Sequence, residues 1–300
     1  MNKQKLKGNL MMLLTALIWG TAFVAQSGAM DSVDPLSFMA ARYLLGAVVL
    51  LPVIALFSKK VQNENKKTLW LGGVLCGIVL FIASALQQYG IVYTTTAKAG
   101  FITTLYVIFV PVAGLFFKKR PAWIVWVGVG LSVAGFYLLT MTEGFTLAVG
   151  DLLVLLCAVA FTAHIMVIDH FSPKVDGIKM SCIQFLICGV LSLIAALIFG
   201  PAEPKALLSA WLPILYTGVL SSGVAYTLQI LAQKFTDAVL VSLIGSLEAV
   251  FATLSGFVFF KLGYIDNGDV TLRQLGGCLL VFIAVILVQL PIGGKKNEKA

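Results

Sequence analysis

Ten runs of mostly apolar residues follow one another along the chain, separated by short segments that carry charges or turn-forming residues. Each run has about the 20 residues that an α-helix needs to cross the apolar layer of a bilayer. The pattern predicts spans at 9–29, 36–57, 68–90, 97–117, 122–141, 150–169, 178–200, 210–231, 238–260 and 272–291. Little of the chain is left outside a membrane, so we expect an all-α integral membrane protein.

Composition agrees with this fold class, because 60% of the residues are hydrophobic and 11% are charged, with a mean hydropathy of +1.00. The first run follows Lys3, Lys5 and Lys7, as the core of a secretion signal would. It is longer than such a core and a second run follows at once, so we interpret it as a retained span. The five cysteines all fall within predicted spans without a CxxC pair, which favours packing over disulfides or metal binding.

The distribution of basic residues predicts the orientation, because cytoplasmic loops carry the excess of Lys and Arg. With the N-terminus inside, sixteen basic residues are cytoplasmic: Lys3, Lys5, Lys7, Lys59, Lys60, Lys66, Lys67, Lys118, Lys119, Arg120, Lys174, Lys179, Lys234, Lys295, Lys296 and Lys299. Four face the other side, namely Lys98, Lys205, Lys261 and Arg273. We therefore expect a multi-pass protein of the plasma membrane with both termini in the cytoplasm. This bias and contact with anionic lipid account for the net charge of +8, so nucleic acid is not an expected partner.

The two halves of the chain align with each other when one is shifted by about 142 residues. The matched pairs include Gly8 with Gly150, Asn9 with Asp151, Thr104 with Ser246, Phe109 with Phe251 and Gly114 with Gly256, and a shift of 141 pairs Gln88 with Gln229. Residues 1–142 and 143–300 are thus predicted to be two repeats of five spans. Because five is odd, the second repeat enters the membrane from the opposite side. Such inverted repeats are typical of secondary transporters that bind substrate between the halves.

Two ionisable residues, Glu248 and Arg42, lie inside predicted spans. Placing such a group in a membrane costs about 2.5–3.5 kcal/mol on insertion scales, which favours a functional role over packing. Glu248 aligns with Tyr106, and both fall near the middle of their spans. Helical periodicity puts Glu248 on one face with Val241 and Gly245, a face of small residues suited to an interior cavity.

Other polar and aromatic side chains in the spans are candidates for the same cavity: Trp19, Gln87, Gln88, His164, Gln184, Tyr226 and Gln229. A helical stripe of Ser222, Tyr226, Gln229 and Gln233 in the eighth span points the same way. Arg42 and Gln88 fall toward one membrane surface and Gln184 and Gln229 toward the other, as two gates would. The alternative for each of these residues is a hydrogen bond that bridges two helices.

Several segments resemble an EamA-type member of the drug/metabolite transporter superfamily: "ALIWGTAFV" at 16–24, "DPLSFMAARYLLGAVVL" at 34–50, "ALQQYGIVYTTTAKAGFITTLYVIFVPVAGLFF" at 85–117 and "SLEAVFATLSGFVFF" at 246–260. The resemblance implies ten helices, with spans 1–4 and 6–9 around a central cavity and spans 5 and 10 to one side. It also implies transport of small polar or amphipathic metabolites. Ala249 replaces a frequent proline after Glu248, which favours a straighter ninth span, and "KKRP" replaces a frequent acid after the fourth.

These features favour a secondary transporter over an enzyme, because facing intramembrane aspartates, clustered histidines and a Walker motif are all missing from the sequence. We expect it to move a small metabolite such as an amino acid, with export as the favoured direction, by alternating access around a central cavity. Glu248 is a candidate for carrying a coupling proton or for pairing with a substrate amine. No cofactor is expected, and the oligomeric state stays open. The alternatives are a channel, or a sensory or scaffolding protein that binds a ligand with the same fold.

Overall fold

The computed structural model describes residues 3–58, 65–94, 96–140, 148–263 and 269–290, and within them it contains helices and no strands. In these ranges nine helical stretches have the length and hydropathy of membrane spans, and Trp123–Leu139 is a shorter apolar helix. The predicted all-α integral membrane protein is therefore confirmed. Outside the described residues lie the predicted span ends at residues 141 and 291, and the basic residues Lys59, Lys60, Lys295, Lys296 and Lys299.

The helices follow the predicted spans to within three residues, except that α1 begins six residues before the predicted start at residue 9. The first half contains α1 (Lys3–Ala29), α2 (Pro35–Phe57), α3 (Lys66–Tyr93), α4 (Thr96–Thr104), α5 (Tyr106–Phe116) and α6 (Trp123–Thr140). The second half contains α7 (Val149–Phe171), η1 (Ser172–Lys174), α8 (Gly177–Phe199), α9 (Pro204–Ser209), α10 (Trp211–Tyr216), η2 (Thr217–Tyr226), α11 (Thr227–Ala232), α12 (Ala238–Gly245), α13 (Leu247–Lys261) and α14 (Leu272–Gln289). The short helices η1 and α9 lie between spans and were not predicted.

Aspartates begin several of the membrane helices. Asp34 accepts hydrogen bonds from the amides of the first turn of α2, and Asp176 does the same for α8. Asp237 accepts a hydrogen bond from the amide of Leu240 and so caps α12. A carboxylate at this position satisfies amides that have no partner within the helix, which explains why these helices begin where they do.

Spans 4 and 9 are each interrupted near the middle. Helices α4 and α5 meet at Leu105, and α12 and α13 meet at Ser246. The interruption at Ser246 comes three residues before Ala249, so the expectation of a straighter ninth span is wrong. Tyr106 and Glu248 consequently lie in the first turn of α5 and α13, respectively.

Span 8 contains a second irregularity, the π-helix η2. A π-helix joins residue i to residue i+5, so residues five apart share a face. This geometry brings Ser221 onto the face of Tyr226. A regular α-helix, which the sequence pattern assumes, would have placed Ser222 there instead.

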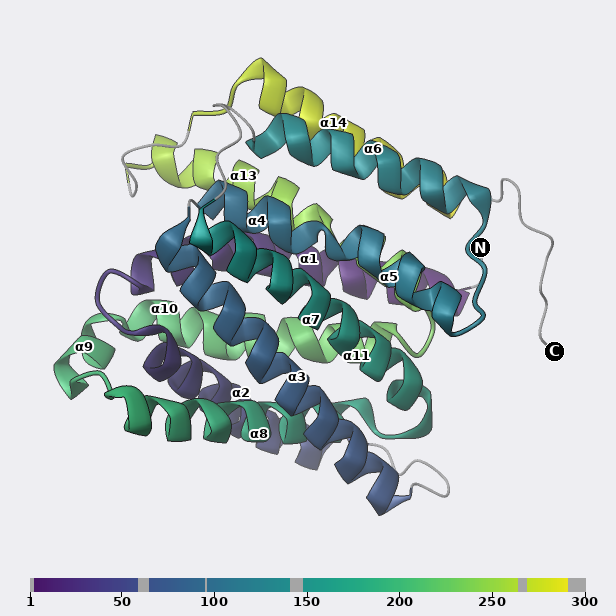
Figure 1. The fold of residues 1–300 in the computed structure, drawn as a ribbon. Helices are drawn as coiled ribbons and strands as arrows, with labels where there is room; N and C mark the ends of the chain where they lie inside the picture. Colours follow the sequence, from purple (N-terminus) through teal and green to yellow (C-terminus); the bar gives the residue numbers. More distant parts are fainter. Residues whose placement is uncertain (1–2, 59–64, 95, 141–147, 264–268, 291–300) are drawn as a thin grey trace.

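The helices form one bundle with a separate pair along one side (Figure 1). Within the bundle α3 packs on α7, α2 on α8, and α1 on α13. Helices α6 and α14 pack on each other and, in Figure 1, lie along the top of the bundle, as the family resemblance implies for spans 5 and 10. Large apolar side chains such as Phe57, Phe199 and Leu272 are exposed around the outside, where a membrane would cover them.

The side chains of Asn9 and Gln289 form a hydrogen bond of 2.9 Å, which joins the start of α1 to the end of α14. Both therefore lie at the same end of the bundle, which we call the N-terminal end. The opposite end, where α1 finishes and α7 begins, is called the distal end.

Candidate functional site

A small cavity lies between the helices near the middle of the bundle, with lining residues from α1–α5, α7 and η2–α13. Its volume is about 40 Å³, which is room for a few water molecules. The space between the helices at this point is thus narrow in this conformation.

The two ionisable residues predicted from the sequence both line this cavity. Glu248 is 5% exposed and Arg42 is 3% exposed. In the part of the chain that the structure describes, neither forms an ion pair with the other or with a third residue. Buried ionisable groups are normally paired, so a cavity with an unpaired carboxyl group and an unpaired guanidinium is a candidate site for a ligand that supplies partners for both.

Glu248 is held by one hydrogen bond, which the hydroxyl of Tyr106 donates to its Oε1 over 2.9 Å. Gly20 of α1 faces the backbone at this point. A Cβ on Gly20 would lie 2.7 Å from the carbonyl oxygen of Glu248, so only glycine lets α1 approach α13 this closely. The close approach keeps Glu248 within the cavity wall and away from the lipid.

Arg42 is held by neutral partners. Its Nη1 donates to Oε1 of Gln26 over 2.5 Å, and its Nη2 donates to the hydroxyl of Tyr43 over 2.8 Å. The Tyr43 hydroxyl is in turn hydrogen-bonded to Ser84. The guanidinium carbon also lies 4.5 Å from the centre of the Tyr43 ring, a cation–π distance. These contacts orient the guanidinium and leave its charge without a counter-ion.

Aromatic side chains line the cavity beside these charges. The ring of Tyr226 lies 4.7 Å from the ring of Trp19 and 5.9 Å from that of His164, and His164 lies 6.4 Å from Phe161. Gln184 holds the His164 ring by a hydrogen bond: Oε1 of Gln184 lies 3.1 Å from Nε2 of His164. The cavity wall therefore combines flat apolar surfaces with a few polar atoms, as small-molecule sites usually do.

Most of the predicted site residues meet in this cavity. Its lining includes Trp19, Arg42, Gln87, Tyr106, His164, Tyr226, Gln229 and Glu248. Gln88 and Gln184 are outside the lining: Gln88 donates to the sulfur of Met30, and Gln184 supports His164. The lining also contains Thr103, which lies on the predicted face of Tyr106, and Gln26 and Ser221, which were not predicted. Gln26 was visible as a polar residue within span 1, whereas Ser221 reaches the site only because η2 is a π-helix.

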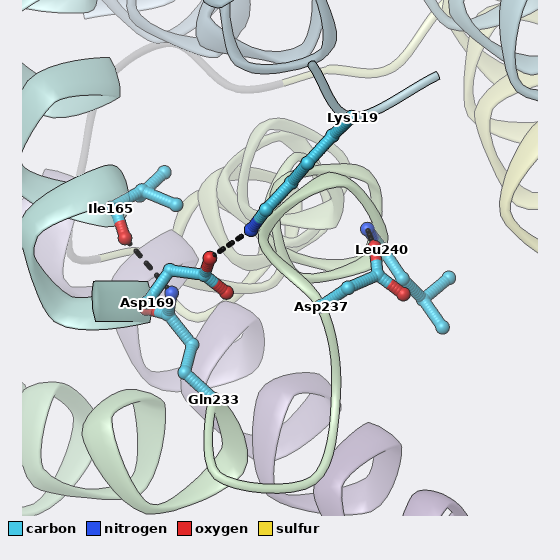
Figure 2. A network of polar contacts seen from close by, with 6 residues as sticks. All are labelled: Lys119, Ile165, Asp169, Gln233, Asp237 and Leu240. Carbon is cyan, nitrogen blue, oxygen red and sulfur yellow. Dashed lines mark hydrogen bonds and ion pairs between the residues drawn. The ribbon is translucent and has the colours of Figure 1, made fainter. Parts of the chain in front are cut away.

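Two polar contacts lie beside the cavity on its N-terminal side (Figure 2). Nε2 of Gln233 donates to the carbonyl oxygen of Ile165 over 2.9 Å, and Ile165 itself lines the cavity. One helical turn further on, Asp169 accepts from Nζ of Lys119 over 2.5 Å. These contacts join α7 to the end of α11 and to the segment that follows α5.

The distal end is closed mainly by apolar packing. Phe23, Ile91, Ala99, Ile102 and Val154 form a buried cluster there. At the margin Asp151 accepts a hydrogen bond from Thr94 and lies 3.7 Å from Nζ of Lys98. The two ends of the cavity thus differ in the kind of contact that closes them.

The described residues contain no group of three or more His, Cys, Asp or Glu side chains that could hold a metal ion. The chemistry available in the cavity is therefore charge pairing, hydrogen bonding and aromatic contact. Such a set of groups suits the binding of a small polar molecule.

Comparison with known proteins places the chain in a family. A family model described as the EamA-like transporter family matches residues 6–141 and residues 148–290. A protein of Archaeoglobus fulgidus described as an uncharacterized transporter is 31% identical over 294 residues, covering 96% of this chain and 88% of that protein. A protein of Clostridium kluyveri with the same description is 27% identical, covering 87% of this chain and 93% of its own length.

A crystal structure of a protein that is 20% identical matches 94% of this chain and 96% of its own, with a TM-score of 0.76, and supports the fold. The family model and the relatives cover nearly the whole chain. The protein is therefore a multi-pass membrane transporter that belongs to the EamA-like transporter family, within the drug/metabolite transporter superfamily.

Proposed function

We propose that this protein is a secondary transporter of the plasma membrane that exports a small zwitterionic metabolite, such as an amino acid, by alternating access. The observation that carries the proposal is a pair of buried ionisable side chains in one cavity, one basic and one acidic and neither in an ion pair: Arg42 and Glu248. A zwitterion supplies a carboxylate for the guanidinium and an ammonium group for the carboxylate. Either charge left alone in a buried site is costly, so the ligand that pairs both is favoured over one that pairs neither.

The inverted repeat explains why the site lies at the centre. Tyr106 and Glu248 are 142 residues apart and form a hydrogen bond. Two residues related by a two-fold axis touch only if they lie beside that axis. If residues 1–142 and 143–300 are the repeats, the axis passes through the candidate site.

Further contacts recur at the same sequence offset and support the repeats. Thr94 bonds Asp151 at the distal end, and the matching residues, Thr236 and Asn9, bond each other at the N-terminal end. A Cβ on Gly77 would meet the carbonyl of Gln184, and one on Gly218 would meet the carbonyl of Arg42. The equivalent helix pairs therefore approach each other in the same way at the two ends.

Alternating access requires each end to open in turn while the other stays closed. Opening the N-terminal end would part Gln233 from Ile165 and Lys119 from Asp169, whereas opening the distal end would part the apolar cluster around Phe23. The central position of Glu248 makes it reachable from either side. A proton bound and released there would couple transport to a proton gradient.

We expect the N-terminal end to face the cytoplasm. Asn65→Cys, at the start of α3, should then resist a membrane-impermeant maleimide in intact cells and react only after permeabilisation. Glu203→Cys, at the start of α9, should react in intact cells. The parent protein, whose five cysteines lie within helices, provides the background. The reverse labelling pattern would contradict this orientation.

Lys119→Met should make the N-terminal end open more readily. The ion pair with Asp169 is half exposed on the lysine side, and such pairs contribute at most about 1 kcal/mol. The expected effect is therefore an increase of up to about fivefold in the labelling rate of a cysteine at Ile165, measured from the N-terminal side. Lys118→Met, at the neighbouring exposed lysine, is the control. Equal labelling rates in the two variants would show that the ion pair does not hold this end closed.

Flux in sealed proteoliposomes tests the proposed function. A thermal-shift screen of the purified protein against amino acids, nucleosides, sugars and polyamines first identifies a ligand, because a specific ligand raises apparent stability by mass action. The ligand is then loaded on one side with and without a proton gradient. Saturable flux and accumulation against a gradient are expected of a secondary transporter. Binding without flux would indicate a sensory or scaffolding protein, and flux that does not saturate would indicate a channel.

A further inference from the structure

Three side chains that line the cavity each carry a buried polar atom without a partner. The atoms are Nε1 of Trp19, Nδ1 of His164 and Oε1 of Gln229. His164 is 0% exposed and Gln229 is 2% exposed. The rings of Trp19 and His164 both contact the ring of Tyr226, and Gln229 follows Tyr226 by three residues, close to one helical turn. These three atoms are separate from the charges of Arg42 and Glu248.

Packing alone does not account for these residues. An apolar side chain of similar size would fill each position without leaving a buried polar atom unmatched, and such atoms are uncommon in native structures. One unmatched atom could be incidental, whereas three on uncharged side chains that line one cavity, beside the unmatched Nε of Arg42, form a pattern. The pattern indicates a ligand group that hydrogen-bonds with all three.

The hydrogen-bonding character of the three atoms specifies that group. Trp19 Nε1 is a donor only, and Gln229 Oε1 is an acceptor only. Oε1 of Gln184 accepts from Nε2 of His164, so Nε2 carries the hydrogen and Nδ1 is left as an acceptor. The three side chains therefore carry one unmatched donor and two unmatched acceptors.

We propose that the substrate is a zwitterion whose side chain ends in a neutral carboxamide, which these three residues recognise. A carboxamide oxygen accepts from Trp19, and its two N–H groups donate to His164 and Gln229, so every group is matched. A carboxylate has no hydrogen to donate, an ammonium group has nothing to offer Trp19, and an alkyl group leaves all three atoms unmatched. This proposal rests on the proposed function, because it extends the site for the zwitterion by a third point of contact.

The test compares ligands that share the zwitterion and differ at the side-chain end. Purified protein is titrated calorimetrically with glutamine, glutamate, lysine and norvaline. Glutamine is expected to bind at least about 100-fold more tightly than norvaline, because a site built to hydrogen-bond rejects an analogue that leaves its polar groups unpaired. Glutamate and lysine are expected to bind more weakly than glutamine as well.

Three variants then remove one contact each: Trp19→Phe, His164→Phe and Gln229→Leu. Each should lower the preference for glutamine over norvaline, taken as the ratio of the two affinities in the same variant, by about tenfold, the effect of one hydrogen bond. Ser132→Ala is the matched control, because the Ser132 hydroxyl is also buried without a partner but lies on α6, outside the cavity lining. The control should keep the wild-type preference.

The outcomes separate this proposal from the one it rests on. If norvaline binds wild-type protein as tightly as glutamine, the carboxamide site is wrong while the zwitterion site stands. The same follows if the three variants keep the wild-type preference. If none of the four amino acids binds, both proposals fail. A preference that Ser132→Ala also lowers would mean that general loosening of the bundle, and not these three contacts, produces it.

Discussion

Glu248→Gln is expected to produce the largest loss of transport of any single substitution in this protein. The change keeps the size of the side chain and its hydrogen bond with Tyr106, and it removes the negative charge and the ability to exchange a proton. If Glu248 pairs with the substrate amine, binding should weaken by about 2–5 kcal/mol, the usual cost when one partner of a buried charge pair is removed. That loss corresponds to a factor of about 30 to 5,000 in Kd.

Two ligands measured side by side distinguish the two roles of Glu248. An amino acid should lose affinity in Glu248→Gln, whereas the corresponding α-hydroxy acid, which has no amine, should not. If Glu248 instead carries a coupling proton, the amino acid should keep its affinity, binding should lose its pH dependence, and gradient-driven accumulation should stop while exchange continues. Glu203→Gln, at an exposed glutamate outside the cavity, is the control. Wild-type binding and wild-type accumulation in Glu248→Gln would contradict both roles.

Arg42→Met is expected to produce the second large loss. Methionine roughly preserves the volume of the buried stem and removes the guanidinium, so an amino acid should bind about 2–5 kcal/mol more weakly. The matching amine, which lacks the carboxylate, should bind wild type and variant equally. Arg42→Lys should recover only part of the loss, because lysine keeps the charge but not the planar fork that engages a carboxylate through two hydrogen bonds.

The arginine experiment has its own control and its own contrary result. Arg273→Met changes an arginine at the start of α14, outside the cavity, and should bind the amino acid as the wild type does. Circular dichroism and a thermal melt check that Arg42→Met is folded, since Gln26 and Tyr43 lose their partner. A folded Arg42→Met protein that binds the amino acid normally would rule out the carboxylate-anchoring role.

The number and the limits of the membrane helices were predictable from the sequence. A helix that crosses the apolar layer must be about 20 residues long and mostly apolar, so its length and composition are visible without any knowledge of its neighbours. The starts of α2, α8 and α12 also depend on nearby residues alone, because Asp34, Asp176 and Asp237 cap the amides that follow them. Glu248 and Arg42 also stood out, since the cost of burying a charge marks such residues wherever they occur.

Local irregularities of the backbone were not predictable in the same way. The sequence pattern assumes 3.6 residues per turn, so it placed Ser222 on the face of Tyr226, whereas η2 places Ser221 there. The helix interruption at Ser246 puts Glu248 in the first turn of α13, and no proline in the sequence marks it. Both depend on how a helix adjusts to the helices packed against it.

The partners of the polar residues were decided by the tertiary structure alone. Gln87 and Gln88 are neighbours of the same type, yet Gln87 lines the cavity and Gln88 faces Met30. Gln26 holds Arg42, Gln233 reaches Ile165, and Lys119 pairs with Asp169 across 50 residues of sequence. A polar residue within a span indicates that its side chain avoids lipid. Physically, that side chain needs only some hydrogen-bonding partner inside the bundle. Which partner it finds depends on the rotation and depth of each helix in the bundle, and packing between distant segments sets both.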